Sequence, residues 1–407
     1  MTRPGVVAPG TPLTVLVNAG PWLPVPPGGY GGIENVVGTL VPELRRLGVR
    51  VVLATVGEST LEADAYVRTL PAGRLERITA PYNQSSGIAH AHMAHVVAAL
   101  RADPSIDLVH DHLEVVGPAV LAAMGRDAPP VLQTLHWDMR KHAEFYGGFD
   151  GGGRVFFAGV SASQVERAPA ALRRQVLGTV PLAVPPPPAL LPAPERGRYA
   201  LVLARITRDK GQDLAVRVCR RAGTPLVLAG PVAGVDDPRE LRRRLADPLD
   251  SLHADPDVAF WREEVEPHVD GDSVRWVGGV SGTVKERWLQ GAAALLAPIR
   301  WAEPGGTVVV EALARGIPVV GTPLGVLPSL VRDGVTGVLA ADEQALAAGL
   351  ARAFHVDPQA CRESVAAWTP EAMARGYLKL YRRVLSLVGT SAAAAVPAGR
   401  TGEPVRP

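Results

Sequence analysis

The residues best suited to chemistry lie in one stretch of the sequence, where Glu303 and Glu311 are separated by seven residues. Pro304 biases Glu303 toward an extended backbone, and the glycines that follow let a ligand approach the main chain closely. A helix that begins near Thr307 would present free amides to phosphate or sugar oxygens. Since carboxylates accept hydrogen bonds strongly from paired hydroxyls, both glutamates could face one ligand that carries diols.

The same stretch also has a simpler interpretation, which is an ordinary loop and helix with two surface glutamates. The consecutive valines at 308–310 could even form a strand.

Histidines and paired aspartates are the other candidates for chemistry. His110 and His112 could be a zinc pair at the end of a strand, but no third ligand follows at a typical spacing. The Asp-x-Asp sequences at 255–257 and 270–272 match a metal-binding pattern, but turn formation explains aspartates in such polar segments better. We therefore predict no metal site.

The length and composition indicate a globular protein with two domains. The chain has 407 residues, of which 47% are hydrophobic and 20% are charged, and about 150 residues per domain is typical. A net charge of +2 and the lack of a basic stripe argue against nucleic acid as a partner. With two cysteines, no disulfide framework is expected, and a cytoplasmic location is the simplest interpretation. No apolar run approaches the ~20 residues that span a bilayer, so no transmembrane segment is expected.

Short apolar runs alternate with amphipathic segments along most of the chain. Continuous valine and leucine runs that alternate with helices are typical of parallel sheets covered on both faces. We predict strands at 13–18, 50–55, 107–110, 130–135, 155–160, 199–204, 225–229, 274–277, 293–298 and 317–321. We predict helices at 33–47, 88–100, 213–222, 284–291 and 307–315, whereas residues 59–86 match no pattern.

A proline-rich segment at 180–188 interrupts this alternation and is the best candidate for a linker. Proline fixes φ and removes an amide donor, so the segment cannot join a central sheet. The sequence therefore predicts an α/β protein with two doubly wound, Rossmann-like domains, residues 1–184 and 185–370, that face each other across a cleft. A final helix is predicted at 371–389, packing back on the N-terminal domain, and a disordered tail at 390–407.

Several short motifs occur in order along the chain. Glu303-x7-Glu311 is followed by Ala-Leu-Ala-Arg-Gly-Ile-Pro-Val-Val, and further motifs lie at 28–34, 134–136, 159–161, 203–211 and 325–337. Together they resemble the motifs of retaining glycosyltransferases of family 4, which have the GT-B fold. The run Glu-Pro-Gly-x-Thr-Val-Val is particularly similar to that of small actinomycete members that decorate natural products.

The resemblance implies a role for each matching residue. Arg205 and Lys210 would bind the donor diphosphate and stabilise the negative charge that develops on it. Glu303 would hold hydroxyls of the donor sugar, and Glu311 would hold those of the ribose. His136 would lie beside the transferred sugar, and His112 would line the acceptor cleft. The loop and helix start after Glu303 would contact sugar and phosphate through Gly305, Gly306, Thr307 and Val308. Gly31 and Gly32 would lie beside the diphosphate or the acceptor. The residues implied in catalysis are Glu303, His136, Lys210 and Arg205.

The sequence departs from the family pattern at specific positions. The family's hinge usually contains Pro-Asn-Gly, where this chain has Pro-Leu-Ala at 181–183. Ala204 stands in place of the glycine before the phosphate-binding arginine, and a glycine pair is reduced to Gly325 and Val326.

The activity that the resemblance implies is retaining, metal-independent transfer of a sugar from a nucleoside-diphosphate donor to an acceptor hydroxyl. The acceptor would be a small molecule or a glycan, and no cofactor is expected. Alternatives are a GT-B epimerase, a sugar phosphorylase, or a catalytically silent subunit that binds nucleotide sugars. An epimerase would need acid and base carboxylates, whereas the resemblance makes the two glutamates clamps for hydroxyls.

Overall fold

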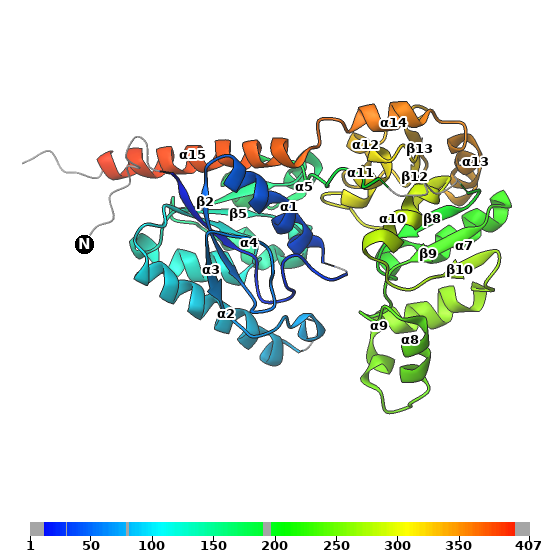
Figure 1. The fold of residues 1–407 in the computed structure, drawn as a ribbon, viewed down its shortest axis with the longest axis horizontal. Coiled ribbons are helices and arrows are strands. Elements are labelled where there is room, and N and C mark those ends of the chain that lie inside the picture. The colour runs from blue at the N-terminus through cyan, green and yellow to red at the C-terminus, as the bar shows by residue number, and fades with distance from the viewer. Residues whose placement is uncertain (1–11, 30, 79–80, 190–196, 395–407) are drawn as a thin grey trace, which may run out of the picture.

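The computed structural model describes residues 12–29, 31–78, 81–189 and 197–394. The chain forms two α/β lobes, each built on a sheet of parallel strands (Figure 1). The N-terminal sheet has seven strands in the order β3-β2-β1-β4-β5-β6-β7, and the C-terminal sheet has six in the order β10-β9-β8-β11-β12-β13. In both sheets the chain builds outward from a central strand in one direction and then in the other, which makes them doubly wound.

Helices separate most consecutive strands of the N-terminal lobe, as predicted. Its strands are β1 (Thr14–Asn18), β2 (Arg50–Thr55), β3 (Ala65–Arg68), β4 (Leu108–Asp111), β5 (Val131–Thr134), β6 (Val155–Gly159) and β7 (Val176–Thr179). Its helices are α1 (Gly32–Arg46), α2 (Tyr82–Ala102), α3 (Val116–Ala123), α4 (Ala143–Gly148), α5 (Ala162–Arg167) and α6 (Ala170–Arg173).

The C-terminal lobe repeats the pattern after the proline-rich linker. Its strands are β8 (Ala200–Leu203), β9 (Leu226–Ala229), β10 (Val274–Trp276), β11 (Ala294–Ala297), β12 (Val319–Gly321) and β13 (Gly337–Leu339). Its helices are α7 (Gln212–Ala222), α8 (Pro238–Leu245), α9 (Pro256–Phe260), α10 (Gly282–Gly291), α11 (Thr307–Ala314), α12 (Leu327–Leu330), α13 (Glu343–Ala353) and α14 (Pro358–Ser364).

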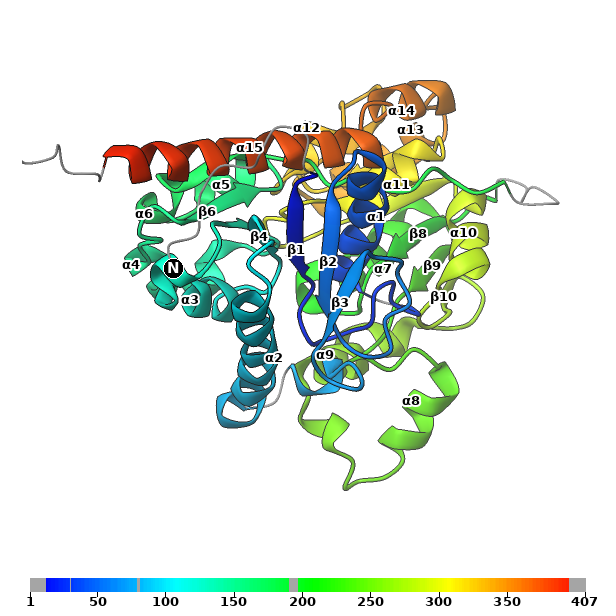
Figure 2. The same ribbon diagram turned by 60° about the vertical axis from the view of Figure 1, so that its left-hand side comes forward.

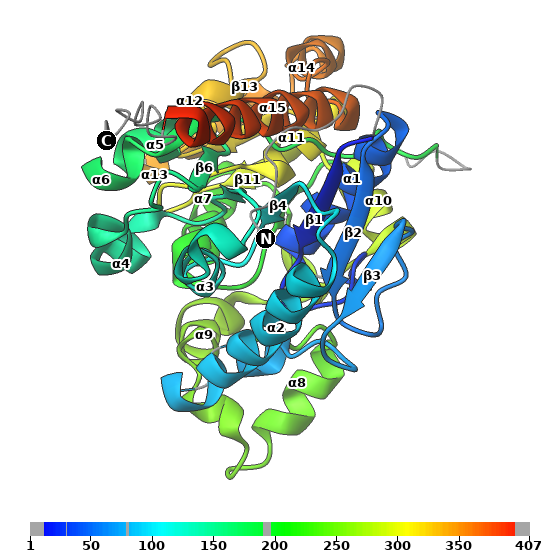
Figure 3. The same ribbon diagram turned by 90° about the vertical axis from the view of Figure 1, so that its left-hand side faces the viewer.

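Both faces of the N-terminal sheet are covered, which explains its continuous apolar runs. Successive residues of a strand point to opposite faces. On β1, Val15 and Val17 pack in the cluster that includes α1 and α15 (Pro370–Ala394), whereas Leu16 packs in the cluster that includes α2 and α3. Figure 3 shows α15 above the strands and α2 and α3 below them.

The last helix, α15, connects the two lobes. Trp368 packs against a core cluster of the C-terminal lobe, and Met373, five residues later, is buried in the core of the N-terminal lobe. From there α15 runs beside α1 along the N-terminal lobe (Figures 1 and 2). The chain therefore returns to its first lobe and adds a helix to that lobe's core.

The edge strands and the end of the chain differ from the sequence prediction. β3, β7 and β13 were not predicted, because β3 and β7 are only partly buried and β13 is three residues long. α2 begins at Tyr82 rather than at residue 88. The predicted tail at 390–407 is wrong in its first part, since α15 continues to Ala394 and its last three residues are alanines, which have the highest helix propensity. Residues 395–407 of that tail lie outside the described part.

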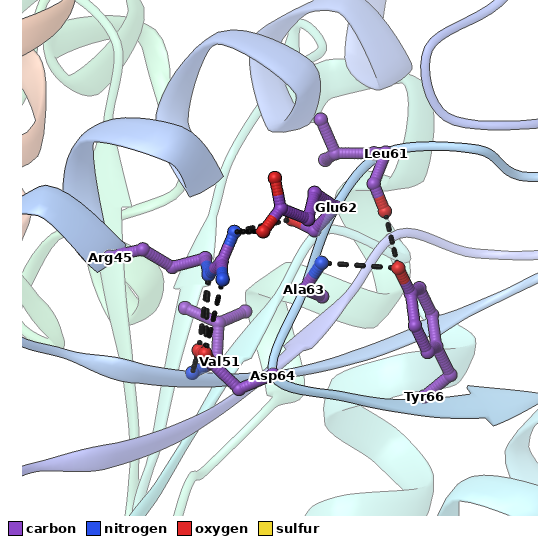
Figure 4. A network of polar contacts seen from close by, with 7 residues as sticks. All are labelled: Arg45, Val51, Leu61, Glu62, Ala63, Asp64 and Tyr66. Carbon is purple, nitrogen blue, oxygen red and sulfur yellow. Dashed lines mark hydrogen bonds and ion pairs between the residues drawn. The ribbon is translucent and has the colours of Figure 1, made fainter.

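A surface network joins α1 to the segment that leads into β3 (Figure 4). Arg45 Nε lies 3.3 Å from both carboxylate oxygens of Asp64, and Arg45 Nη1 lies 3.0 Å from Glu62 Oε1. Asp64 also accepts a hydrogen bond from the amide of Val51 at 2.8 Å. These contacts fix the edge strand, which has a neighbour on one side only. In the part of the chain that is described, no helix is both long and apolar enough to span a membrane.

A buried ion pair locks α10 to α11. Arg315 Nη2 lies 2.5 Å from Glu286 Oε1 and Arg315 Nε lies 2.7 Å from Glu286 Oε2, with both side chains less than a tenth exposed. Arg315 Nη1 also donates to the carbonyl oxygen of Glu311 at 2.9 Å. The pair therefore fixes the helix that carries Glu311.

We predict that Glu286→Ala destabilises the C-terminal lobe by ~3–5 kcal/mol, because it leaves the Arg315 guanidinium buried without its carboxylate. Thermal and urea unfolding of the two proteins would measure the difference. The control is Glu240→Ala, which removes the exposed partner of Arg243 on α8 and should leave the unfolding midpoint unchanged. Equal effects of the two substitutions would contradict the prediction.

Candidate active site

The carboxyl ends of the central strands carry the predicted site residues. Arg205 and Lys210 follow β8, and Glu303 follows β11, which is the neighbour of β8 in the C-terminal sheet. His112 follows β4 and His136 follows β5, which are neighbours in the N-terminal sheet. Ligands of doubly wound sheets bind outside the carboxyl ends of the strands, near the point where the strand order reverses. The fold therefore places these residues where such a site is expected.

An ion pair joins the two loops of the C-terminal lobe. Lys210 Nζ donates to Glu303 Oε2 at 2.6 Å, and about a fifth of each side chain is exposed. Lys210 Nζ also lies 4.8 Å from the centroid of the Trp301 ring. The structure thus brings together a cation and a carboxylate that are 93 residues apart in sequence, in a place that solvent still reaches.

Arg300 joins the Glu303 loop to the Lys210 loop and to the start of α7, through both its side chain and its amide. Its guanidinium donates twice to the carboxylate of Asp213 at 2.6 Å, and its amide donates to the carbonyl oxygen of Asp209 at 2.8 Å. Burial raises the pKa of Asp213, but hydrogen bonds from Arg300 and Arg217 outweigh this effect and hold that pKa below its usual value. Sequence reasoning did not identify this anchor, because Arg300 and Asp213 are 87 residues apart.

The loop after β8 is also held from within. The carbonyl oxygen of Arg205 accepts a hydrogen bond from Gln212 Nε2 at 2.7 Å, and Gln212 is fully buried. The side chain of Arg205 is exposed, on the same loop as Lys210. The departure from the family pattern at Ala204 fits the local packing, because the close approach is made by Gly230, where a Cβ would collide with the Ala204 carbonyl oxygen.

Gly325 accounts for the departure from the family's glycine pair, where this chain has Gly325 and Val326. Its φ is 59°, and a Cβ at this position would collide with the backbone nitrogen and oxygen of Glu303. The next residue, Val326, donates its amide to the carbonyl oxygen of Glu303 at 2.8 Å. A single glycine therefore lets the chain pack against the backbone of Glu303, and the amide of the following residue fixes that backbone.

The stretch after Glu303 forms the predicted helix and not a strand. Gly306 precedes α11 with φ 60°, and no side chain of the described residues caps this helix. The amides of Val309 and Val310 bond to the carbonyl oxygen of Gly306, so those of Thr307 and Val308 precede the first bonds within the helix. A Cβ on Gly305 would come within 2.7 Å of Leu182 Cδ1, which shows that the altered hinge packs directly on this loop.

Glu311 lies one turn into α11 and has a partner that the sequence prediction missed. Lys285 Nζ on α10 donates to Glu311 Oε1 at 2.8 Å, and 27% of the Lys285 side chain and 18% of the Glu311 side chain are exposed. The structure thus pairs each glutamate of the motif with a different lysine. Lys285 belongs to none of the motifs, so only the packing of α10 on α11 identifies it.

The two predicted histidines touch each other. His112 Nδ1 lies 2.8 Å from His136 Nε2, and the rings stack with centroids 5.1 Å apart. Burial lowers the pKa of His136 to about 3 and lowers that of His112 well below its usual value. Both imidazoles are therefore neutral near pH 7 and act through hydrogen bonds rather than charge.

Glu114 holds the main chain at His136 and was also missed. Its Oε1 accepts the amides of His136 at 2.7 Å and of Trp137 at 2.8 Å. Burial raises the pKa of Glu114 to about 7, and the backbone donors oppose that rise. Since 22 residues separate Glu114 from His136, no local pattern could connect them.

The predicted glycines lie at the start of α1. Gly31 precedes the helix and Gly32 is its first residue, whereas Tyr30 lies outside the described part. A Cβ on Gly31 would come within 2.7 Å of Pro27 and 3.2 Å of Glu34 Oε2. Burial raises the pKa of Glu34 to about 7, so the carboxyl beside Gly31 is protonated at mildly acidic pH.

Loops of the two lobes approach each other near these residues. Lys141, just after His136, places its Nζ 5.1 Å from the Trp137 ring centroid and 5.9 Å from that of Trp301 in the other lobe. A Cβ on Gly29 would lie 3.9 Å from Asp236 Oδ2 of the C-terminal lobe. The loop after His136 therefore faces the loop that carries Trp301 and Glu303, and the glycine loop faces the segment after β9 that carries Asp236.

The Asp-x-Asp sequences serve turns. Asp255 caps α9 by accepting the amide of Asp257, and Asp270 accepts the amides of Asp272 and Val274. Within residues 12–29, 31–78, 81–189 and 197–394, no three His, Cys, Asp or Glu side chains are grouped as ligands for a metal ion.

Comparisons with known proteins agree with this arrangement. The family model described as Glycosyl transferases group 1 matches residues 189–368, and the model described as Glycosyltransferase Family 4 matches residues 30–172. AviGT4, a glycosyltransferase involved in avilamycin A biosynthesis, is similar in structure at 25% identity and a TM-score of 0.62, over 92% of this chain and 98% of that chain.

Two more distant structures share the fold. Sucrose-phosphate synthase from Thermosynechococcus elongatus is 20% identical with a TM-score of 0.63, over 92% of this chain and 99% of that chain. HepE from Anabaena, in complex with UDP-glucose, is 14% identical with a TM-score of 0.58, over 92% and 99%. No curated protein matches the sequence significantly.

The two parallel sheets, their doubly wound order and these matches define the GT-B fold, as the sequence predicted. The two family models and the likeness to AviGT4 define the class more narrowly: the chain is a glycosyltransferase.

Glu34→Gln tests the buried carboxyl beside the glycine loop. The pKa of Glu34 rises from 4.5 to about 7 on folding, so between these values the unfolded chain is ionised while the folded chain keeps its proton. The wild type therefore loses stability as the pH rises through this interval, by ~1.4 kcal/mol per unit at most. Glutamine does not titrate, so the free energy of unfolding of the variant should rise relative to that of the wild type as the pH increases from 4.5 to about 7. The total relative gain is roughly 3 kcal/mol, and it should not increase further above this interval.

Urea unfolding of both proteins at several pH values between about 4 and 8 measures this difference. A stability difference that stays constant over the whole interval would show that Glu34 does not titrate as described.

Proposed function

We propose that this glycosyltransferase moves a sugar from a nucleoside-diphosphate donor to an acceptor hydroxyl, with retention of configuration and without a metal ion. The observation that carries the proposal is the 2.6 Å pair between Lys210 and Glu303, since Glu303 lies on the loop that leads into the N-terminus of α11. A cation, a carboxylate and free helix amides in one place suit a ligand with an anionic end and a hydroxyl-rich end.

The charged groups of the C-terminal lobe are suited to the donor. Arg205 and Lys210 would bind the diphosphate and stabilise the negative charge that it gains as it leaves. Glu303 would accept hydrogen bonds from hydroxyls of the transferred sugar, while the amides at Gly306, Thr307 and Val308 meet sugar or phosphate oxygens. Glu311, one turn further along α11, would accept those of the ribose.

The neutral groups of the N-terminal lobe are suited to the sugar and the acceptor. His136 would hydrogen-bond to the transferred sugar, and His112, at 2.8 Å from it, would line the acceptor side. Gly31 and Gly32 would allow the diphosphate or the acceptor to approach the start of α1. HepE, which has the same fold, was solved with UDP-glucose, and this supports a nucleotide sugar as the donor.

The mechanism needs no enzymic nucleophile. The departing phosphate oxygen would take the proton of the acceptor hydroxyl while that hydroxyl oxygen bonds to the sugar carbon on the same face. The protein's contribution is then to fix the two substrates and to stabilise the leaving group. The acceptor is a small molecule or a glycan in this proposal.

We predict that Lys210→Ala and Glu303→Gln each lower the rate of sugar transfer by about 10² or more, because both groups act on the transition state. The measurement is kcat for transfer, or for slow donor hydrolysis in the absence of acceptor. The matched control is the exposed ion pair of α8, substituted as Arg243→Ala and Glu240→Gln, which should keep the wild-type rate.

Near-normal rates in both site variants would disprove the site assignment. Tight donor binding with no turnover toward any acceptor or water would favour the silent binding subunit. Release of a sugar phosphate on addition of inorganic phosphate would favour the phosphorylase, and isomerisation of a donor alone would favour the epimerase.

We also predict that nucleoside diphosphates raise the melting temperature. A ligand at a hundredfold excess over its Kd adds ~2.7 kcal/mol of apparent stability. A panel of nucleoside diphosphates should contain at least one that shifts the wild type by several degrees, while the matching nucleoside without phosphates does not. Lys210→Ala should lose most of the shift, and no shift with any diphosphate would contradict the proposal.

A further inference from the structure

A hydrogen-bonded circuit that begins and ends on α15 lies next to the histidine pair. Tyr381 OH lies 2.7 Å from His110 Nδ1, His110 Nε2 lies 2.8 Å from Thr134 Oγ1, and Thr134 Oγ1 donates to Tyr377 OH at 3.0 Å. All four side chains are fully buried. The two tyrosines are one turn apart on α15, so the circuit begins and ends on the same helix.

The direction of every hydrogen bond in the circuit follows from counting protons. The Thr134 hydroxyl has one proton, which it gives to Tyr377, so it must accept from His110 Nε2–H. Burial keeps His110 neutral, with its pKa lowered to about 3. A neutral imidazole has one N–H, so His110 Nδ1 accepts and the Tyr381 hydroxyl donates.

Two routes connect this circuit to His136. Thr134 is the last residue of β5 and His110 lies on β4, so each stands two residues before a histidine of the site, His136 or His112. The His110 ring also packs on the His112 ring with centroids 4.2 Å apart, and His112 Nδ1 meets His136 Nε2 at 2.8 Å. The circuit therefore acts on both strand ends and on the rings themselves.

The proton between the site histidines can also be placed. His112 Nε2 is buried with no hydrogen-bond partner among the described residues. Since an unpaired N–H is rarer in protein interiors than an under-satisfied acceptor, the proton of His112 lies on Nδ1 and is donated to His136 Nε2. His136 then carries its own proton on Nδ1.

We propose that Tyr377 and Tyr381 are positioning residues that act on His136 from the C-terminal helix. They hold the ends of β4 and β5 through His110 and Thr134, and so fix the orientation and the tautomer of the imidazole that faces the sugar. The proposal rests on the function proposed above, because it assumes that His136 contacts the transferred sugar. It also gives α15, which enters from the C-terminal lobe, a part in the chemistry of the N-terminal lobe.

The test compares Tyr381→Phe and Tyr377→Phe with Val384→Ala on the same helix. The phenylalanine variants keep the ring packing and remove one hydroxyl each. Val384 is fully buried in the same core cluster and lies outside the circuit, so its substitution weakens α15 without breaking these bonds.

We expect each phenylalanine variant to lower kcat by about fivefold while the donor KM changes by less than about twofold. Val384→Ala should lower the melting temperature at least as much and leave kcat unchanged. If kcat follows the melting temperature in all three variants, the tyrosines are merely structural and the proposal is wrong.

A second readout separates this proposal from the proposed function. Nitrogen NMR of histidine-labelled protein, with His136 assigned through His136→Gln, should show an Nδ1–H tautomer for His136 in the wild type and a changed signal in both phenylalanine variants. Unchanged His136 signals in both would overturn the proposal. If the signals change but the wild type transfers no sugar, the positioning circuit stands and the proposed function fails.

Discussion

The ion pair between Lys210 and Glu303 is the contact on which the rest of the site depends. It joins loops that leave two neighbouring strands, β8 and β11, and it places a cation beside a carboxylate at 2.6 Å. Both side chains are about four-fifths buried, so salt screens the pair less than it screens an exposed one. Arg300 braces the same loops through Asp213, and Gly325 lets the chain pass directly behind Glu303. The positions of Lys210 and Glu303 are therefore fixed by their own ion pair, by Arg300 and by the close packing of Gly325.

The two lobes contribute opposite kinds of chemistry. The C-terminal lobe presents charged groups in partly exposed ion pairs, Lys210 with Glu303 and Lys285 with Glu311. The N-terminal lobe presents two neutral imidazoles, because burial lowers the pKa of His112 and of His136. The same effect that neutralises the histidines raises the pKa of Glu114 to about 7. In the proposed function, the cationic loops suit the diphosphate of the donor and the neutral imidazoles suit hydroxyl groups.

Sequence reasoning succeeded where the physical signal was local and strong. Central strands such as β1 and β2 are buried on both faces, which leaves an apolar run that is easily read. The edge strands β3, β7 and β13 were missed, whereas the edge strand β10 was predicted; β3, for example, is partly exposed and has no such run. The motif residues were found because the family pattern keeps them close in sequence. The partners of those residues were not found, because Lys285, Glu114 and the tyrosines of α15 reach the site from elements far away along the chain.

The sequence alone determined the order of the central strands, the two-lobed α/β class and the position of the motif that contains the two glutamates, since periodicity and short motifs depend on neighbouring residues. It also indicated correctly that α11 begins near Thr307. Only the tertiary structure decided what each glutamate touches, which histidines are neutral, and how the last helix reaches beneath His136. Hydrogen bonds and burial join residues across 22 to 271 positions of the chain, and such distances leave no trace in a local pattern. The protonation states follow from burial, which exists only once the lobes have folded.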